Sequence, residues 1–264
     1  MITADKKGQV VHSAADIYET FFVPALFQSW PEKLAGAAGI RTGQRVLDVA
    51  CGTGILARHL AECVGDSQLV DAIDINESML AVARQKAPSI NWHRAAAEQL
   101  PFEDNSFDAV FCQFGLMFFD DRAQAIREMQ RVLRPQGQLV IAVWDRLENT
   151  PGYLAVTHLL DDLFGSGIAS EIRAPYVLGD IDELKKPFTA AGIDDISIIT
   201  VQGTARFPSI NDWMYTDIKG WTLADMLDDS QFELLRTEAN KALQRFSDNE
   251  GTISFAAPAH IIVA

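Results

Sequence analysis

The chain has 264 residues, with 22 Lys and Arg against 36 Asp and Glu, so its formal net charge is −14. Nonspecific binding to DNA or RNA depends on a basic face, and no basic cluster stands out in this sequence, so nucleic acid is excluded as an expected partner. The charge is divided unevenly. Residues 1–145 carry 18 acids and 13 bases, whereas residues 146–264 carry 18 acids and 9 bases, so the second half is the more acidic one.

Composition and cysteine usage point to a folded protein of a reducing compartment. The chain is 48% hydrophobic and 22% charged, which is typical of one large globular domain, with or without an inserted lid. Cys51, Cys63 and Cys112 are an odd number without a CxxC spacing, so we expect neither a disulfide framework nor a metal site. The first residues lack the apolar core of a signal peptide, and no stretch approaches the roughly 18 apolar residues of a membrane span. The sequence therefore predicts a cytoplasmic protein without a membrane span.

The first predicted elements are helical. Residues 14–38 place apolar side chains at helical spacing, interrupted by Pro24 and Pro31, which predicts two or three short helices within an N-terminal cap over residues 1–43. The pattern then changes. RVLDVA is a short apolar run, the glycine-bearing turn CGTG follows it, and ILARHLAECV resumes helical periodicity, so a strand, a turn and a helix are expected.

The same plan repeats through residue 145. The predicted elements are a strand in QLVDAIDI, a helix in ESMLAVARQKA, a strand near residues 90–93, a strand in FDAVFCQF, a helix over 121–134, a turn at 135–137 and a strand in LVIAVW. Strands that alternate with helices at this spacing favour a parallel α/β sheet. We therefore expect residues 44–145 to form its core.

After Trp144 the regularity weakens. We expect a helical insertion at about 146–179, a helix over 180–191 ended by Gly192, one strand in IDDISIITVQGTARF, a second helical insertion at about 209–247 and one closing antiparallel strand in GTISFAAPAHIIVA. His260 is expected to pack within that last strand. Residues 146–264 thus hold the remaining core strands and two insertions that would form a lid.

The glycine turn is the first feature that indicates a ligand. Gly52, Gly54 and Ala57 match a loose G-x-G-x-x-A fingerprint, and Asp74 follows Gly54 by 20 residues, where a ribose-binding acid is expected. A dinucleotide or S-adenosylmethionine could use this geometry. Asp48 ends the strand before the turn, where a carboxylate would repel a diphosphate and favour an ammonium or sulfonium group. The sequence therefore favours S-adenosylmethionine, unless Asp48 only caps the turn.

At these residues the chain resembles the class I S-adenosylmethionine-dependent methyltransferases, specifically the UbiE-like (methyltransferase type 11) group related to ubiquinone and menaquinone biosynthesis. The resemblance lies in VLDVACGTG (46–54), AIDINESML (72–80), AAEQLPFEDNSFDAV (96–110) and EMQRVLRPQGQLVIAVW (128–144), in order and spacing. It covers roughly residues 14–145. It implies a Rossmann-like, seven-stranded, mostly parallel sheet with an antiparallel last strand and helical lid insertions.

The resemblance also implies a set of cofactor contacts. Gly52 and Gly54 let the backbone approach the ligand, and Asp74 would accept hydrogen bonds from the two ribose hydroxyls. The full cofactor-binding set implied is Asp48, Ala50, Gly52, Thr53, Gly54, Asp74, Ile75, Met79, Ala96, Ala97, Glu98, Gln113, Tyr18 and Trp30. Met79 has the alternative role of a core residue. Ala96 replaces a frequent Asp, so we expect binding to weaken by about 1 kcal/mol, and Gln136 replaces a frequent glycine without expected functional consequence.

Methyl transfer is an in-line displacement, so the protein mainly aligns the acceptor and excludes water, and a catalytic base is optional. The candidate catalytic residues are Tyr18, Gln113 and His158, the last because an imidazole titrates near neutrality. The candidate acceptor contacts are Tyr18, Phe22, Phe118, Tyr153, Tyr176 and Trp213. The alternative for the aromatic residues and for His158 is structural packing in helices.

The sequence thus predicts an S-adenosylmethionine-dependent methyltransferase that acts on a small-molecule O, N or C acceptor and releases S-adenosylhomocysteine, as a monomer or a homodimer. One alternative is a quinone-pathway C-methyltransferase, and another is an S-adenosylmethionine-binding protein without transfer activity. A quinone would call for an apolar mouth, whereas residues 212–250 are dense in Asp and Glu. We expect the acidic half to favour cationic or neutral acceptors over anionic ones.

Overall fold

The computed structural model describes residues 12–220, 223 and 226–264, so the first eleven residues of the expected cap lie outside the described part. The described chain opens with α1 (His12–Ile17), the π-helix η2 (Tyr18–Phe27) and α2 (Trp30–Ala38), which confirms the short helices expected here. Pro31 stands in the first turn of α2, where its missing N–H costs nothing. Pro24 lies inside η2 without ending it. Because π-helical turns are rare and gather at functional sites, η2 is a segment of interest.

Alternating strands and helices follow, as expected. They are β1 (Val46–Val49), α3 (Ile55–Val64), η3 (Ser67–Leu69), β2 (Val70–Asp74), α4 (Glu77–Lys86), β3 (Asn91–Arg94), β4 (Phe107–Gln113), η4 (Leu116–Phe118), α5 (Arg122–Val132) and β5 (Leu133–Trp144). Local side chains define where the helices begin. The Asn76 side chain accepts a hydrogen bond from the Ser78 N–H at 2.9 Å and starts α4, and Asp121 accepts from the Gln124 N–H at 2.9 Å and starts α5.

The second half contains the insertions and the remaining strands. Its elements are η5 (Leu147–Asn149), α6 (Pro151–Phe164), α7 (Ser166–Arg173), η6 (Ala174–Tyr176), α8 (Ile181–Ala191), β6 (Ser197–Val201), β7 (Thr204–Phe207), α9 (Ile210–Lys219), α10 (Asp229–Ala242), η8 (Gln244–Phe246), β8 (Ile253–Ala256) and β9 (Ala259–Val263). Gly192 ends α8 with a φ of +87°, a left-handed conformation that favours glycine. Residues 221–222 and 224–225 of the second insertion lie outside the described part.

Seven strands form one sheet in the order β3-β2-β1-β4-β5-β9-β6. Strands β1 to β5 pair in parallel, and β9 runs antiparallel between β5 and β6. This confirms the Rossmann-like, mostly parallel sheet with a reversed last strand. His260 lies in β9 with 2% of its surface exposed, and its Nδ1 is 2.9 Å from the hydroxyl of Thr200 on β6, so it packs within the sheet.

Two strand predictions were wrong. The run IDDISIITVQGTARF forms β6 and β7, and the run GTISFAAPAHIIVA forms β8 and β9, because each chain segment leaves one sheet and enters another. Strands β7 and β8 pair antiparallel in a separate two-stranded sheet. The change occurs at Gly203, where a Cβ would lie 2.3 Å from the Ala257 carbonyl oxygen, and the Ala257 N–H donates to the Gly203 carbonyl at 3.0 Å. Pro258 follows at once and interrupts the second run.

The expected turn at 135–137 is instead part of β5. Its pairing with β4 shifts register between Phe107 and Ala109, so the segment is a bulge within the ladder. Gln136 adopts a φ of +69° here, a left-handed conformation that costs a residue with a side chain about 1 kcal/mol. A Cβ on Gly137 would lie 2.9 Å from the Asp108 carbonyl oxygen, so this position requires glycine.

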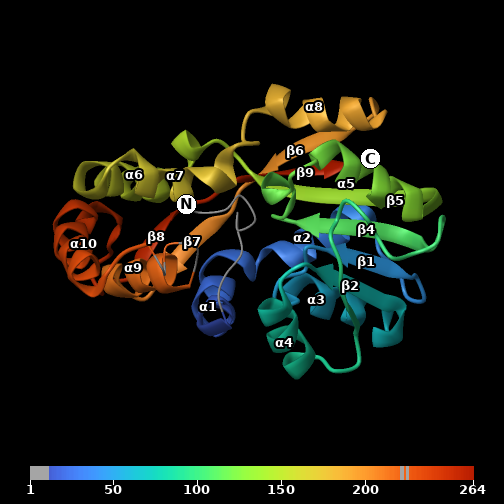
Figure 1. Cartoon of the computed structure of the whole chain (residues 1–264), viewed down its shortest axis with the longest axis horizontal. Coiled ribbons are helices and arrows are strands. Elements are labelled where there is room, and N and C mark those ends of the chain that lie inside the picture. The colour runs from blue at the N-terminus through green and yellow to red at the C-terminus, as the bar shows by residue number, and fades with distance from the viewer. Residues whose placement is uncertain (1–11, 221–222, 224–225) are drawn as a thin grey trace.

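The arrangement separates the sheet from the insertions (Figure 1). Helix α2 packs on α3 and on β4 and β5, and α5 packs on α8. Helices α6, α7, α9 and α10 gather with β7 and β8 at the left of the picture, and we call these six elements the lid. The division into segments at residues 43 and 145 stays a prediction. Within the described part of the chain, no helix is long and apolar enough to cross a membrane.

Candidate functional site

A first pocket lies where β1 and β4 end, beside the glycine turn. We call it the turn pocket, and it encloses about 290 Å³. Its lining is Tyr18, Asp48, Ala50, Cys51, Gly52, Thr53, Ile55, Leu56 and Gln113. The structure therefore brings together six of the residues predicted to bind the cofactor, from η2, β1, the turn and β4.

The turn has little room for side chains. Gly52 and Gly54 have φ angles of +54° and +85°, and Ala50 has a φ of +58°. A Cβ on Gly54 would lie 2.3 Å from the indole ring of Trp92 on β3, so only glycine fits there. A Cβ on Gly52 would lie 4.0 Å from the Tyr18 ring, which leaves its backbone open toward the pocket.

Three buried polar atoms converge on the turn pocket. Asp48 Oδ2, Thr53 Oγ1 and Gln113 Oε1 have no hydrogen-bond partner among the described residues. Burial raises the pKa of Asp48 well above its usual value, the Ala57 N–H opposes this rise, and the charge of Asp74 adds to it. None of the lining residues is basic. The pocket therefore suits a ligand group that carries both positive charge and N–H donors.

Asp74 ends β2 and is half-buried. Its Oδ2 accepts the Gly52 N–H at 2.8 Å and its Oδ1 accepts the Asn76 N–H at 2.8 Å. Burial raises the pKa of Asp74, and these backbone N–H groups oppose the rise. Since a carboxylate has about four lone pairs, both oxygens can still accept from ligand hydroxyls. Ile75 beside it is 49% exposed, whereas Met79 is 7% exposed.

Met79 has neighbours that the sequence pattern did not indicate. It packs with Ala14 and Ala15 of α1 and with Val82 of its own helix, and Tyr18 lies against this cluster. Helix α1 therefore covers the side chain of Met79, which packs in this small cluster. Its predicted contact with the adenine stays a prediction.

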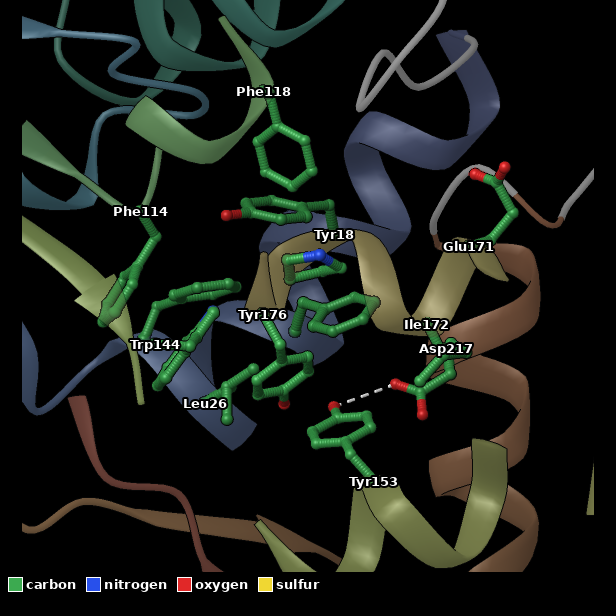
Figure 2. Close-up of a pocket in the computed structure, with 13 residues that line it drawn as sticks. Tyr18, Leu26, Phe114, Phe118, Trp144, Tyr153, Glu171, Ile172, Tyr176 and Asp217 are labelled. Atoms are coloured by element: carbon green, nitrogen blue, oxygen red, sulfur yellow. Dashed lines mark hydrogen bonds between the residues drawn. The ribbon is translucent and has the colours of Figure 1, made fainter. Parts of the chain in front are cut away.

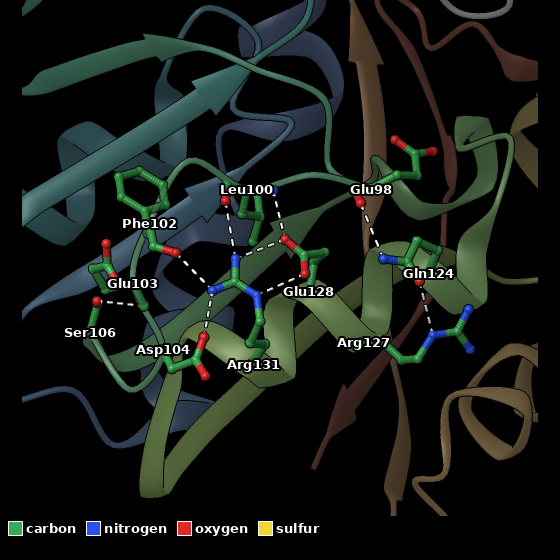
Figure 3. A network of polar contacts seen from close by, with 10 residues as sticks. All are labelled: Glu98, Leu100, Phe102, Glu103, Asp104, Ser106, Gln124, Arg127, Glu128 and Arg131. Carbon is green, nitrogen blue, oxygen red and sulfur yellow. Dashed lines mark hydrogen bonds and ion pairs between the residues drawn. The ribbon is translucent and has the colours of Figure 1, made fainter.

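The predicted adenine segment is fastened to α5 (Figure 3). Ala97 is buried, and Ala96 and Glu98 are half-buried. Arg131 donates to the Leu100 carbonyl at 3.1 Å and to the Phe102 carbonyl at 2.8 Å. Arg131 also donates from Nε to Glu128 Oε1 at 2.8 Å and from Nη1 to Asp104 Oδ1 at 2.8 Å. Glu128 Oε2 accepts the Leu100 N–H at 2.8 Å, and Gln124 Nε2 donates to the Glu98 carbonyl at 3.3 Å. The loop thus has a fixed shape.

Helix η2 is tied to the glycine turn by ion pairs. Glu19 accepts from Arg58 Nη2 at 2.9 Å and pairs with Lys86 Nζ at 3.2 Å, and its carboxyl is 9% exposed. Arg58 also donates from Nη1 to the Thr53 carbonyl at 2.6 Å. These contacts place Tyr18, the residue before Glu19, against the turn pocket. Burial, reinforced by the charges of Asp74 and Glu19, raises the pKa of Tyr18, so its hydroxyl stays protonated.

A second pocket, which we call the aromatic pocket, adjoins the first at Tyr18 (Figure 2). It encloses about 550 Å³, part of it open to solvent. Its lining is Tyr18, Phe22, Leu26, Phe27, Phe114, Phe118, Trp144, Tyr153, Glu171, Ile172, Pro175, Tyr176 and Asp217. Five of the six predicted acceptor contacts are among them. Phe114 and Trp144 stack with their ring centroids 3.8 Å apart and form one wall.

Three predicted site residues lie elsewhere. Trp30 is 1% exposed and contacts Phe114 and Trp144 edge-on behind the wall of the aromatic pocket. Trp213 is fully buried and contacts Tyr153 edge-on at 6.0 Å from outside the lining. His158 is exposed on α6 and lines neither pocket. The two tryptophans thus pack in the core and His158 faces solvent. Other aromatic rings form the walls of the aromatic pocket.

Asp217 is a pocket residue that sequence reasoning missed. It is 1% exposed, its Oδ1 accepts the Tyr153 hydroxyl at 3.1 Å, and its Oδ2 has no hydrogen-bond partner among the described residues. Burial raises the pKa of Asp217 to about 8, and the neighbouring Tyr153 hydroxyl and Trp213 indole oppose the rise. The indole N–H lies outside hydrogen-bonding geometry. The missed signal is its position four residues after Trp213, on the apolar face of α9.

The acidic segment at residues 212–250 contributes little to the aromatic pocket. Of the described acidic residues in 212–250, only Asp217 lines the aromatic pocket, and the others are exposed or half-buried. The acidity of this segment therefore does not count against an apolar acceptor. Eight of the thirteen lining residues are aromatic, and Leu26, Ile172 and Pro175 are aliphatic.

Comparisons with known proteins agree with this geometry. Residues 5–165 match the ubiE/COQ5 methyltransferase family. The ubiquinone/menaquinone biosynthesis C-methyltransferase UbiE of Pseudomonas paraeruginosa is 32% identical over 219 residues, which cover 76% of this chain and 86% of that protein. The UbiE protein of Edwardsiella ictaluri is 37% identical over 170 residues, which cover 60% of this chain and 66% of that protein, just under two thirds.

Solved structures show the same fold at low sequence identity. The Haemonchus contortus phosphoethanolamine N-methyltransferase 2, in complex with S-adenosyl-L-methionine, has a TM-score of 0.61 at 19% identity and covers 96% of this chain and 57% of that one. A Bacillus halodurans methyltransferase structure has a TM-score of 0.59 at 21% identity and covers 88% of this chain and 96% of that one. The family match, with the sheet order and the glycine turn, leads to one conclusion: the chain belongs to the ubiE/COQ5 methyltransferase family and is an S-adenosylmethionine-dependent methyltransferase.

Proposed function

We propose that this enzyme methylates an apolar, ring-bearing small molecule held in the aromatic pocket, with the cofactor in the turn pocket. The observation that carries the proposal is the position of Tyr18, which lines both pockets. The two pockets therefore adjoin at this ring, and ligands bound in them would lie next to each other. Direct contact between donor and acceptor is what an in-line displacement needs.

The residues of the turn pocket fit the amino-acid part of S-adenosylmethionine. Asp48 Oδ2 and Gln113 Oε1 are buried acceptors without partners among the described residues, and an ammonium group offers three N–H donors to them. The backbone of Gly52 and Thr53 and the beginning of α3 suit its carboxylate. Asp74 would hold the ribose hydroxyls. When bound, S-adenosylmethionine supplies an electrophilic methyl group on a sulfonium.

Ile75, Ala96, Ala97 and Glu98 would contact the adenine. Ile75 is 49% exposed next to Asp74, so its side chain is accessible to a ligand. The Arg131 network fixes the main chain of the 98–104 loop, so its backbone donors are held ready before a ligand arrives. Trp30 lies outside both linings, and we do not include it in the site.

The chain's own contribution to the reaction is alignment and exclusion of water. The stacked rings of Phe114 and Trp144 and the ring of Tyr18 form flat apolar walls that suit a planar acceptor. His158 lines neither pocket. The titratable groups of the described lining are carboxyl groups, Tyr hydroxyls and the Cys51 thiol, and no imidazole lies next to an acceptor. The structure therefore supports a mechanism that relies on positioning.

A ring carbon is the acceptor atom that we favour. The relatives are named as ubiquinone/menaquinone biosynthesis C-methyltransferases, and the apolar lining of this pocket suits a quinone-type ring. Oxygen or nitrogen acceptors on a similar ring would fit the same walls. A cytoplasmic location, and a monomeric or homodimeric state, stay predictions from the sequence.

Calorimetry with S-adenosylmethionine and S-adenosylhomocysteine tests the first part of this proposal. Both should bind wild type, and Asp74→Ala should weaken both; equal binding by the variant would contradict the assignment of the turn pocket. Transfer of a tritiated methyl group should then be screened across hydroquinones, phenols, ring amines and ring carboxylates. Cofactor binding without transfer to any of these classes would favour a binding protein instead.

A further inference from the structure

One buried carboxyl stands out in the aromatic pocket. Asp217 comes from α9, is 1% exposed, and is held through Oδ1 by the Tyr153 hydroxyl at 3.1 Å. Its Oδ2 has no hydrogen-bond partner among the described residues. A buried polar atom in this state costs the folded protein stability, so its presence in an aromatic lining calls for a ligand that satisfies it.

The surroundings of Asp217 define what that ligand group can be. No Lys, Arg or His among the described residues forms an ion pair with Asp217. The only other carboxyl in the lining is that of Glu171, and the remaining polar groups are Tyr hydroxyls and an indole. Because the described lining contains no cation, it disfavours burial of an anionic substituent and accommodates a hydrogen-bond donor, either neutral or cationic.

Asp217 lies away from the point of methyl transfer. Figure 2 shows Asp217 and Tyr153 at the bottom of the pocket and Tyr18 and Phe118 at the top, with Tyr176 between them. Since Tyr18 marks the border with the turn pocket, a ligand that contacts Asp217 spans the aromatic pocket. Its other end is then presented at Tyr18.

We propose that Asp217, positioned by Tyr153, is a specificity-determining residue that binds a hydrogen-bond-donating group on the end of the acceptor remote from its methylated atom. The inference rests on the proposed function of the aromatic pocket. Hydroxyl and ammonium groups share the required chemistry, whereas an ether lacks the donor and a carboxylate brings a charge that no cation in the described lining offsets. A site built to satisfy a donor discriminates strongly against analogues that lack it.

Binding of four naphthalene probes to the full-length protein, in the presence of S-adenosylhomocysteine, tests this proposal. The probes are 2-naphthol, 2-naphthylmethylamine, 2-methoxynaphthalene and 2-naphthoate, and quenching of tryptophan fluorescence reports occupancy because Trp144 lines the pocket. We expect wild type to bind 2-naphthol or the amine at least tenfold more tightly than the ether, and 2-naphthoate most weakly. Whichever donor binds more tightly identifies a neutral or a cationic acceptor.

Asp217→Leu should abolish this preference while the affinity for 2-methoxynaphthalene stays the same or improves. Asp217→Asn and Tyr153→Phe are second variants, in which we expect the preference to shrink severalfold. Glu171→Leu is the matched control, because it removes the other, half-exposed carboxyl of the lining and should leave the preference intact. A preference that persists in Asp217→Leu, or tightest binding of 2-naphthoate by wild type, would overturn the proposal.

Failure of this inference is distinguishable from failure of the proposed function. Methyl transfer that occurs with equal preference in wild type and Asp217→Leu rejects the role of Asp217 and keeps the enzyme assignment. A donor preference that depends on Asp217, without transfer to any acceptor class, keeps the role of Asp217 in binding and rejects the proposed reaction.

Discussion

Arg58 on α3 donates to Glu19 on η2 at 2.9 Å and, with its other terminal nitrogen, to the carbonyl of Thr53 in the glycine turn. One guanidinium therefore joins the helix that carries Tyr18 to the loop that is proposed to hold the cofactor. Because Arg presents its donors in a rigid fork, it fixes two partners relative to each other in a way that a lysine would not.

Glu19→Gln should weaken binding of S-adenosylmethionine. The change removes the charge that holds Arg58 and Lys86, so η2 packs less firmly against the turn pocket. We expect the affinity to fall five- to tenfold, or about 1 kcal/mol, measured by calorimetry. Glu77→Gln removes an exposed partner of Arg84 and serves as the control; an equal loss there would contradict the specific role of Glu19.

Cofactor binding should release a proton from Asp48. Burial raises the pKa of this carboxyl in the free enzyme, and a bound ammonium or sulfonium favours its ionised form. The affinity should therefore rise with pH above the usual carboxyl range, as linkage requires when the complex holds fewer protons. Calorimetry in buffers of different ionisation enthalpy measures the release. Asp48→Asn should lose it, and an unchanged release in this variant would assign the proton to Asp74 instead.

The stability of the folded protein should depend on pH through Asp217. Its folded pKa of about 8 lies above the unfolded value near 3.8, so the native state holds the extra proton between these values. Stability from this group is complete below the unfolded pKa and is lost as pH rises toward 8, by up to about 1.4 kcal/mol per pH unit. Asp217→Asn cannot titrate. Its free energy of unfolding in urea, relative to that of wild type, should therefore increase from pH 5 to pH 8. A difference in the free energy of unfolding that stays constant over this pH range would contradict the raised pKa of Asp217.

Arg131→Lys should loosen the proposed adenine loop. A lysine cannot reproduce the contacts that Arg131 makes with the Leu100 and Phe102 carbonyls and with Glu128. We expect the free energy of unfolding to fall by about 2 kcal/mol and cofactor affinity to fall with it. Arg127→Lys, at an exposed position of the same helix, should cost less than about 0.5 kcal/mol. Matching losses in the two variants would show that the loop is held by other means.

Gln136→Gly should stabilise the fold. Gln136 is exposed and has a φ of +69°, so glycine removes backbone strain without removing a buried contact. Glycine also makes the unfolded chain more flexible, which offsets part of this effect. The free energy of unfolding should therefore rise by about 0.5 kcal/mol, seen as a higher urea midpoint. Gly137→Ala should do the reverse, because its Cβ would meet the Asp108 carbonyl oxygen at 2.9 Å.

The residues that sequence analysis placed well are those whose role is set by neighbours in the chain. Gly52 and Gly54 have positive φ angles in the turn. Asp48 is the last but one residue of β1 and Asp74 ends the adjacent parallel strand β2, so their proximity follows from the strand order. Local conformation and strand order therefore account for the meeting of these residues at the glycine turn, whereas their roles toward the cofactor are implied by the family resemblance.

Sequence analysis misplaced the residues whose positions depend on packing between segments that are distant in the chain. Trp213 and His158 lie on lid helices whose rotation is set by contacts with other helices, and nothing in their own segments says which face meets the pocket. Asp217 was missed for the same reason, since one acid on an apolar helix face resembles the many acids around it. The break at Gly203 depends on its close approach to Ala257, which lies 54 positions later.

That close approach has a mechanical consequence. Both segments that lead from the main sheet into the small sheet pass through the hydrogen bond between Gly203 and Ala257, so the lid strands are continuations of core strands. Separating β7 and β8 from the core would break this hydrogen bond at the junction of the two sheets. The amide proton of Ala257 should therefore exchange with solvent only as slowly as the main sheet unfolds, and the two sheets should melt as one cooperative unit.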